Sequence, residues 1–391
     1  NKPASEVTDA IISVGDASII EKYNADHGTS YVPLSPENVS VNDGGLVVVF
    51  EGDSKSDPIE VTITTDESMS QNVTYAFPLQ VTSTTPGVHS GADHIVFVKN
   101  CKGKKFASSA KPSGIKLFSC METGSTNPLF HKSFMLEKSG LPLFDVVILF
   151  SAKIVYDEEE CRLKIWNTPA IAGIIQSDVV KQLHDYGMKV IISVLGSDEA
   201  GVAHLTDAAC RTFAQEIANY CEAYDLDGVF FDDEYTYSWN HPGLTSPSTD
   251  RAARLCFETK MAMPDKMVTC YIYSRTYGFY KKIEGMEPGD FVDYAISDYG
   301  SWDYEHYYLG MERNQVAPCS ANFASSYARW TATQNNLQRV RNEGFGGFMV
   351  YCLTFHVADV WNREMESLRN IAKYLYDDNL VFTGEKPETT W

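Results

Sequence analysis

An apolar segment that runs directly into acidic residues stands near the middle of the chain: residues 225–235 read DLDGVFFDDEY. The apolar run between a glycine and a carboxylate predicts a short buried strand, Gly228–Phe231. Side chains alternate along a strand, so Phe230, Asp232 and Glu234 should share one face while Asp233 points the other way. Two carboxyl groups this close cannot both ionise freely, so the pKa of one should rise, which suits a general acid.

The sequence on both sides of this segment alternates between apolar strands and amphipathic helices. Helices are predicted over Ser177–Tyr186, Asp207–Ala223 and Ser326–Asn342. About eight strands are predicted: Ile115–Cys120, Val146–Phe150, Val190–Leu195, Gly228–Phe231, Met267–Tyr273, Phe291–Ile296, Gln315–Pro318 and Gly347–Leu353. This rhythm predicts an α/β fold, a TIM (β/α)8 barrel over residues 114–391, whose active site lies at the carboxyl ends of the strands.

The first 100 residues have a different composition. They carry 14 acidic and 4 basic residues, and their predicted strands are short and rich in Val, Thr and Tyr. These strands are Gly45–Glu51, Ile59–Thr65, Asn72–Val81 and His94–Lys99. We therefore expect a small all-β sandwich over residues 1–100 that serves as an accessory domain, joined to the barrel by a lysine-containing linker over residues 101–113.

Composition and motifs exclude several classes of function. The net charge of −20 would repel a nucleic acid, and no apolar run is long enough to cross a membrane. The sequence contains no G-x-G-x-x-G, P-loop, G-x-S-x-G or H-E-x-x-H motif, and its nine cysteines include no C-x-x-C pair. Nucleotide binding and hydrolysis by serine, cysteine or zinc therefore have no support in the sequence.

Two other interpretations of the acidic segment remain open at this point. The carboxylates could be solvated loop residues that cap the next helix. They could also bind a divalent metal ion, because carboxylate oxygens are hard ligands, although no second Asp or His cluster completes a coordination shell. We expect neither a metal nor another cofactor.

The acidic segment resembles a known family signature. Asp227-Gly228, Asp232 and Glu234 are similar to the D-G-x-D-x-D-x-E motif of glycoside hydrolase family 18, and residues 226–235 resemble its endo-β-N-acetylglucosaminidase H and F branch more than its chitinases. The likeness extends in order through residues 144–156, 189–196, 263–266, 293–302 and 343–346, and spans roughly residues 114–376. The first 100 residues also resemble a β-rich module of exported glycan-degrading proteins from Gram-negative bacteria.

The resemblance implies roles for three catalytic residues. In family 18 the 2-acetamido group of the substrate is the nucleophile, so no second carboxylate attacks the sugar. Glu234 would protonate the leaving oxygen and later activate water. Asp232 would hold the acetamido N–H and stabilise the oxazolinium intermediate, and Tyr299 matches the tyrosine whose hydroxyl contacts the acetamido oxygen.

The sequence departs from the family at two positions. Phe230 occupies the place of the usual fourth-position Asp, and an apolar ring beside Asp232 should raise the pKa of Asp232 by desolvation. The eighth strand offers Tyr351 where chitinases have the tryptophan that forms the floor of their site. We expect Glu122 to bind a sugar hydroxyl. Sugars stack on aromatic rings, so we also expect glycan contacts from Tyr351 and from five rings near or beyond the ends of predicted strands: Tyr235, Trp239, Tyr271, Tyr273 and Trp302.

These features predict an endo-β-N-acetylglucosaminidase that cleaves the β-1,4 bond between the two core N-acetylglucosamines of N-linked glycans, with high-mannose glycans favoured as partners. A chitinase-like hydrolase of N-acetylglucosamine oligomers is the first alternative. A catalytically silent glycan-binding barrel is the second. The resemblance of the first 100 residues implies export to the periplasm or bacterial cell surface, where a segment ahead of Asn1 could have carried a lipid anchor.

Overall fold

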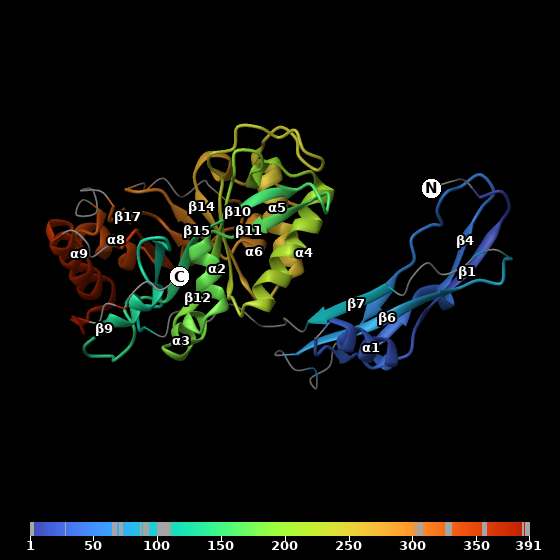
Figure 1. Ribbon diagram of the computed structural model, residues 1–391, viewed down its shortest axis with the longest axis horizontal. Coiled ribbons are helices and arrows are strands. Elements are labelled where there is room, and N and C mark those ends of the chain that lie inside the picture. Colours follow the sequence, from blue (N-terminus) through green and yellow to red (C-terminus); the bar gives the residue numbers. More distant parts are fainter. Residues whose placement is uncertain are drawn as a thin grey trace. The chain divides into compact units, whose positions relative to one another are not determined.

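The computed structural model describes the chain in two compact units, Asn1–Lys104 and Lys105–Trp391. Figure 1 traces both units from the blue N-terminus to the red C-terminal helix α9. The residues that the structure describes are 4–27, 29–64, 69, 73–86, 88, 94–99, 111–300, 302, 308–324, 331–353, 358–384 and 387.

The first unit is a small sandwich of two sheets. Its larger sheet has the order β2-β6-β1-β4, with β7 also paired to β6, and β3 pairs with β5 in the smaller sheet. Leu34, Met69 and Phe77 are buried between strands of both sheets. The helix α1 was not predicted from the sequence. The bounds are β1 (Thr8–Val14), α1 (Ser18–His27), β2 (Val32–Pro33), β3 (Val39–Val41), β4 (Leu46–Val49), β5 (Val61–Ile63), β6 (Thr74–Thr82) and β7 (His94–Lys99).

The second unit is a barrel of parallel strands surrounded by helices, as predicted (Figure 1). Its sheet has the order β16-β15-β14-β13-β12-β10-β8-β18-β17. The bounds are β8 (Lys116–Glu122), β10 (Val146–Asp157), β12 (Lys189–Leu195), β13 (Gly228–Asp232), β14 (Met267–Ile272), β15 (Tyr294–Ser297), β16 (Val316–Ala317), β17 (Ser320–Asn322) and β18 (Gly347–Tyr351).

The helices lie outside this sheet, which gains one antiparallel strand, and a separate antiparallel pair forms a small sheet of its own. Strand β11 (Arg162–Trp166) forms a hairpin with the extended end of β10, and β9 (Phe134–Leu136) pairs with β19 (Leu380–Phe382). The described helices are α2 (Pro169–Gln176), α3 (Val179–Asp185), α4 (Asp207–Ala223), α5 (Thr249–Ala262), α6 (Pro288–Phe291), α8 (Gln334–Asn342) and α9 (Ala358–Tyr376).

Several predicted boundaries differ from the structure for identifiable reasons. Of the predicted helix Ser326–Asn342, residues 326–330 lie outside the described residues, and the described helix α8 begins at Gln334, where the Thr333 side chain caps the first turn by accepting from the Asn336 N–H. The predicted strand from Phe291 begins at Tyr294, because Pro288 opens the short helix α6 just before it. Helix α2 and the hairpin of β10 with β11 were not predicted.

The seventh barrel strand is split around Pro318. Its first half, β16, pairs with β15, and its second half, β17, pairs with β18. Proline has no N–H to donate to a neighbouring strand, which accounts for the break. The strand predicted from the sequence ended at Pro318 and therefore did not include β17. Strand β17 brings Asn322 to the carboxyl end of the barrel.

Strand alternation creates two buried layers. Phe118, Ile148, Ile191 and Phe230 point into the barrel, where they form one apolar cluster. Their strand neighbours, such as Val229 and Phe231, instead pack outward in the cluster that includes the helices. The side chains beyond the inner layer, at the carboxyl ends of the strands, are therefore those that surround the mouth of the barrel.

Candidate active site

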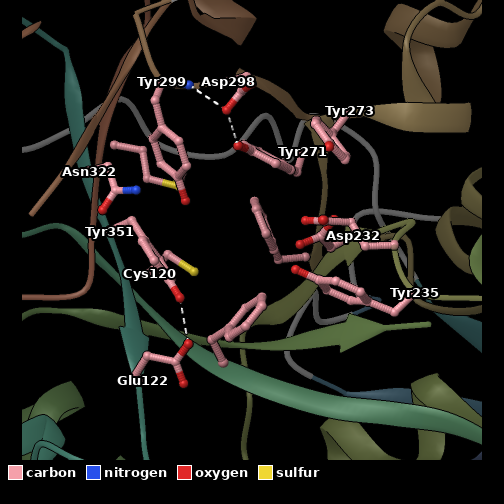
Figure 2. A pocket seen from close by; sticks show the side chains of 14 residues that line it. Cys120, Glu122, Asp232, Tyr235, Tyr271, Tyr273, Asp298, Tyr299, Asn322 and Tyr351 are labelled. Atoms are coloured by element: carbon pink, nitrogen blue, oxygen red, sulfur yellow. Dashed lines mark hydrogen bonds between the residues drawn. The ribbon is translucent and has the colours of Figure 1, made fainter. Parts of the chain in front are cut away.

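A pocket of about 500 Å³ opens above the inner layer of the barrel. Most of its lining is contributed by the carboxyl ends of the strands and by the residues that directly follow them (Figure 2). The lining residues are Cys120, Glu122, Phe150, Phe230, Asp232, Glu234, Tyr235, Tyr271, Tyr273, Asp298, Tyr299, Asn322, Met349 and Tyr351.

The end of β13 supplies the two carboxyl groups predicted to share a face. Phe230, Asp232 and Glu234 all line the pocket, whereas Asp233 does not. Strand β13 lies between β12 and β14, which pair with it on either side. Tyr235, directly after Glu234, has a positive φ of 61°, so the chain turns sharply at that residue.

Burial raises the pKa of Asp232 well above its ordinary value. Its side chain is 3% exposed, and the negative charges of Glu234 and Asp233 add to the effect of desolvation. A hydrogen bond also joins its carboxyl group to that of Glu234. Its Oδ1 atom is buried and has no hydrogen-bond partner among the described residues. The N–H group of a ligand would supply the missing donor.

The pKa of Glu234 is raised as well, mainly by desolvation and also by the negative charge of Asp298. Interactions with the Tyr235 hydroxyl and the Asp232 carboxyl group lower the pKa of Glu234 in part. The sequence predicted a raised pKa for one residue of this pair, whereas in the structure the pKa values of both residues are raised. The pair therefore shares protons and titrates as a coupled unit, with Glu234 the more accessible of the two.

A second wall of the pocket is built on Asp298, the residue that follows β15. Its carboxylate accepts a hydrogen bond from the Tyr271 hydroxyl and another from the Tyr299 N–H, the latter at 2.6 Å (Figure 2). The Tyr271 ring stacks on that of Tyr273, with 5.9 Å between centroids. Asp298 thereby fixes both the side chain of Tyr271 and the backbone of Tyr299.

The remaining wall joins β8 and β18. The Tyr351 hydroxyl donates a hydrogen bond to Oε1 of Glu122 (Figure 2), and the Tyr351 ring packs on Phe150 and Tyr299 at centroid distances of 5.9 and 5.8 Å. The pKa of Tyr351 is raised by burial and by the Glu122 carboxylate, so the tyrosine keeps its proton and remains a donor.

The structure brings together all of the predicted site residues except Trp239 and Trp302. Trp239 lies against His204, with 5.4 Å between ring centroids. Trp302 packs under the Arg339 guanidinium, 4.3 Å from its ring centroid, and edge-on to Phe345. Neither tryptophan lines the pocket.

Asp298 and Asn322 line the pocket but were not singled out from the sequence. Asp298 directly follows a predicted strand, so the rule that selected Glu234 could also have selected Asp298. Asn322 had no such signal, because the predicted seventh strand stopped before β17. Among the described residues there is no group of three or more His, Cys, Asp and Glu that could hold a metal ion.

Comparison with known proteins places this site in a family. A family model described as an N-terminal domain matches residues 2–88. Endo-β-N-acetylglucosaminidase F1 of Elizabethkingia meningoseptica is 38% identical over 322 residues, which are 81% of this chain and 94% of that protein. The chain belongs to the endo-β-N-acetylglucosaminidases of glycoside hydrolase family 18.

Solved structures from this family resemble the whole chain. EndoBT-3987 of Bacteroides thetaiotamicron, in a structure with a Man5GlcNAc product, is 29% identical and has a TM-score of 0.65, covering 100% of this chain and 91% of that one. A second structure of EndoBT-3987, in complex with a Man9GlcNAc2Asn substrate, is 27% identical with the same TM-score and covers 98% of this chain and 94% of that one.

The family resemblance inferred from the sequence is therefore confirmed, and the protein is a glycoside hydrolase. In the part of the chain that the structure describes, no helix combines the length and the apolar character needed to cross a membrane.

Proposed function

We propose that the enzyme hydrolyses the β-1,4 bond between the two core N-acetylglucosamine residues of N-linked glycans, with the substrate's own 2-acetamido group as nucleophile. The buried, unpartnered Oδ1 of Asp232 carries this proposal, because an acetamido N–H would satisfy it. Reaction through the acetamido group needs no second nucleophilic carboxylate and no cofactor.

Each residue of the pair then has a distinct task. In the reactive state Glu234 holds the proton that the pair shares, and Asp232 is ionised. Asp232 then accepts the acetamido N–H, which turns the acetamido carbonyl oxygen toward the anomeric carbon, and its negative charge stabilises the oxazolinium intermediate. Tyr299 contacts the acetamido oxygen through its hydroxyl. Glu234 donates its proton to the leaving oxygen and then removes a proton from the water that opens the intermediate.

The electrostatics of the pocket suit this sequence of steps. A general acid must hold its proton in the free enzyme, and burial together with Asp298 raises the pKa of Glu234 toward the working range. When the leaving oxygen takes that proton, Glu234 becomes negatively charged, which favours the positive charge that develops on the sugar.

High-mannose glycans are the proposed substrate class. The related EndoBT-3987 was solved with Man5GlcNAc and with Man9GlcNAc2Asn, both mannose-bearing N-glycan chains. We infer that the glycan contacts come from Glu122 and the ring-bearing residues of the pocket: Tyr235, Tyr271, Tyr273 and Tyr351. Carbohydrate C–H faces stack on such rings, and the Tyr235 and Tyr273 side chains are 55% and 42% exposed at the rim.

The two alternative functions are less well supported. A chitinase-like enzyme is expected to have a tryptophan on the eighth strand. This chain has Tyr351 there, hydrogen-bonded to Glu122. A silent binding protein would normally have lost its acid, whereas Glu234 is present and lines the pocket.

We also propose that the second unit carries the catalysis and that the first is an accessory module, because every lining residue of the pocket belongs to the second unit. The curated relative is bacterial and degrades glycans, which supports export to the periplasm or cell surface, where protein-linked glycans are accessible.

Intact-mass analysis of a glycoprotein that carries one high-mannose glycan tests the proposed bond. The wild type should leave a single N-acetylglucosamine on asparagine, and Glu234→Gln should leave the glycan whole. Chitin oligomers serve as the competing substrate. Cleavage of chitin oligomers with an unchanged glycoprotein mass would favour the chitinase-like alternative, and no cleavage of either would favour the silent binding protein.

A further inference from the structure

Asp233 is an acidic residue in the motif that the proposed mechanism does not use. It lies between Asp232 and Glu234 but faces away from the pocket, and it is 4% exposed. Its Oδ1 accepts a hydrogen bond from the Ala203 N–H at 3.1 Å, and the Arg275 backbone lies close enough to lower the pKa of Asp233. A buried carboxylate is costly unless such donors compensate it, which argues for a specific task.

These two neighbours of Asp233 belong to different loops at the mouth of the barrel. Ala203 lies in the short helix Val202–His204, within the loop that follows β12, and Arg275 lies in Ser274–Thr276, directly after β14. Strands β12 and β14 are the two neighbours of β13. The Asp233 side chain is therefore hydrogen-bonded to the loop after β12 and lies close to the loop after β14.

The loop after β12 also lies tightly against the backbone of Glu234. A Cβ atom added to Gly196 would come within 2.4 Å of the Glu234 carbonyl oxygen and 2.5 Å of Thr236 Oγ1. A glycine is needed there because backbone approaches backbone so closely. The position of this loop and the position of Glu234 are thus coupled through Asp233 on one side and through Gly196 on the other.

We propose that Asp233 is a positioning residue that fixes the backbone of Glu234 by holding the loops after β12 and β14 against the end of β13. This inference rests on the proposed function of Glu234 as the acid. A carboxylate suits the task because one of its oxygens accepts the Ala203 N–H while its charge faces the nearby Arg275. Its partners are backbone groups, so the neighbouring side chains are not required to change when it is replaced.

Four charged or titratable groups surround Asp233. His204 and Arg275 favour its ionised form, although burial dominates and raises the pKa of Asp233. Burial lowers the pKa of His204, which is therefore largely neutral, and its ring nitrogens have no hydrogen-bond partner among the described residues. The charge of Asp233 in turn raises the pKa of both Asp232 and Glu234. Removing that charge should lower both pKa values.

The test compares kcat and KM of the full chain with those of Asp233→Asn and Asp233→Ala, on a glycopeptide with a high-mannose glycan. Misplacement of a catalytic group by about 1 Å costs about 100-fold in rate, so kcat of Asp233→Ala should fall by up to about that factor while KM changes little. Asp233→Asn keeps one carbonyl oxygen for the Ala203 N–H and should recover part of the rate. The basic limb of its pH profile should move to lower pH.

A matched control is Asp185→Asn, which removes one charge from an exposed residue that pairs with Lys181 outside the pocket. It should keep wild-type kcat and pH profile. Circular dichroism and thermal melting show whether each variant is folded at the assay temperature. If Asp233→Ala fails to fold, Asp233→Asn decides the question through its kcat and its pH profile.

Two results overturn this inference without touching the proposed function. The first is a folded Asp233→Ala, or a folded Asp233→Asn where Ala does not fold, with wild-type kcat and an unmoved basic limb. The second is a loss that appears only in KM. An inactive wild type in the same assay would instead contradict the proposed function itself.

Discussion

Tyr235 is the residue through which the acidity of Glu234 can be tuned with least disturbance. Its hydroxyl interacts with the Glu234 carboxylate, which lowers the pKa of Glu234 and opposes the effect of burial. In Tyr235→Phe this donor is lost, so the pKa of Glu234 should rise and Glu234 should stay protonated to higher pH. The basic limb of kcat/KM should therefore move to higher pH.

The measurement is the pH dependence of kcat/KM, with Tyr237→Phe as the control. Tyr237 is 73% exposed and does not line the pocket, so its variant should keep the wild-type profile. A basic limb that stays in place or moves to lower pH in Tyr235→Phe would show that the Tyr235 hydroxyl does not interact with Glu234.

Asp232 should lower the stability of the folded enzyme as the pH rises. Its folded pKa lies above the unfolded value, so its contribution is fully favourable below about pH 4, where both states are protonated, and is lost as the pH rises through the folded pKa. Asp232→Asn cannot ionise and should become more stable than the wild type with rising pH. Each tenfold change in the acid constant is worth about 1.4 kcal/mol.

Urea unfolding of both proteins between about pH 3 and neutral pH checks this expectation, because this range spans the unfolded carboxyl pKa of about 4. The difference in unfolding free energy should be small at the acidic end and should grow toward neutral pH. If the difference in unfolding free energy stays constant, or decreases as the pH rises, ionisation of Asp232 does not destabilise the folded state.

At the scale of single residues, the sequence supplied the acidic pair and its orientation, because side-chain alternation along a strand is a local rule. It also identified Phe230 as a source of desolvation for Asp232, and burial is indeed the largest cause of the raised pKa. Asp298 was missed because its importance lies in hydrogen bonds to Tyr271 and the Tyr299 backbone, which depend on how neighbouring strands meet.

The loop after β12 is the element whose packing most constrains the site. Gly196→Ala would place a methyl group within 2.4 Å of the Glu234 carbonyl oxygen, and a backbone atom cannot move aside as a flexible side chain can. We expect the variant to lose about 1–3 kcal/mol of stability, as overpacked sites do, and to lose activity because Glu234 is displaced.

Gly124→Ala is the matched control, because a Cβ atom there meets nothing within 4 Å. It should change the stability by no more than about 0.5 kcal/mol. Thermal melts and initial rates of both variants provide the comparison. Wild-type rates and melting temperature in Gly196→Ala would mean that the loop can yield without moving Glu234.

Helices and strands could be predicted where the hydrophobic periodicity was strong. Their bounds could not be predicted where pairing with a strand distant in the sequence determines them. Helix α4 has the predicted bounds, Asp207–Ala223, because its apolar stripe and its Thr206 cap are both local signals. The long strand β10 continues past Phe150 because it pairs with β12 as far as Lys153 and with β11, which folds back onto it, as far as Asp157. The split of the seventh strand depends on which neighbour each half meets, and that information is not local.

The whole molecule consists of two units, each with a hydrophobic core of its own. All residues that line the pocket lie in the second unit. A chain that begins at residue 105 should therefore fold cooperatively and hydrolyse a small glycopeptide with a kcat close to that of the full chain. Denaturant unfolding and steady-state kinetics test this, and a loss of turnover by a folded barrel unit would assign the first unit a part in catalysis.

At this scale the barrel could be predicted because eight strands alternating with helices admit few other architectures. The first unit was predicted as a sandwich from its short strands. The helix α1 was not predicted, because it has few apolar residues on one face and only Ile20 is buried. The positions of Trp239 and Trp302 could not be predicted either, because long loops place them against His204 and Arg339.

The proposed mechanism depends on attack by the acetamido oxygen of the substrate, which Asp232 holds in place. Proton NMR of the glycan at the earliest times of release tests this most directly, because attack by a neighbouring group followed by water preserves the anomeric configuration. The reducing-end N-acetylglucosamine should appear first as the β-anomer and only later equilibrate. Release of the α-anomer first would mean that water attacks directly, and would contradict the assignment of Asp232.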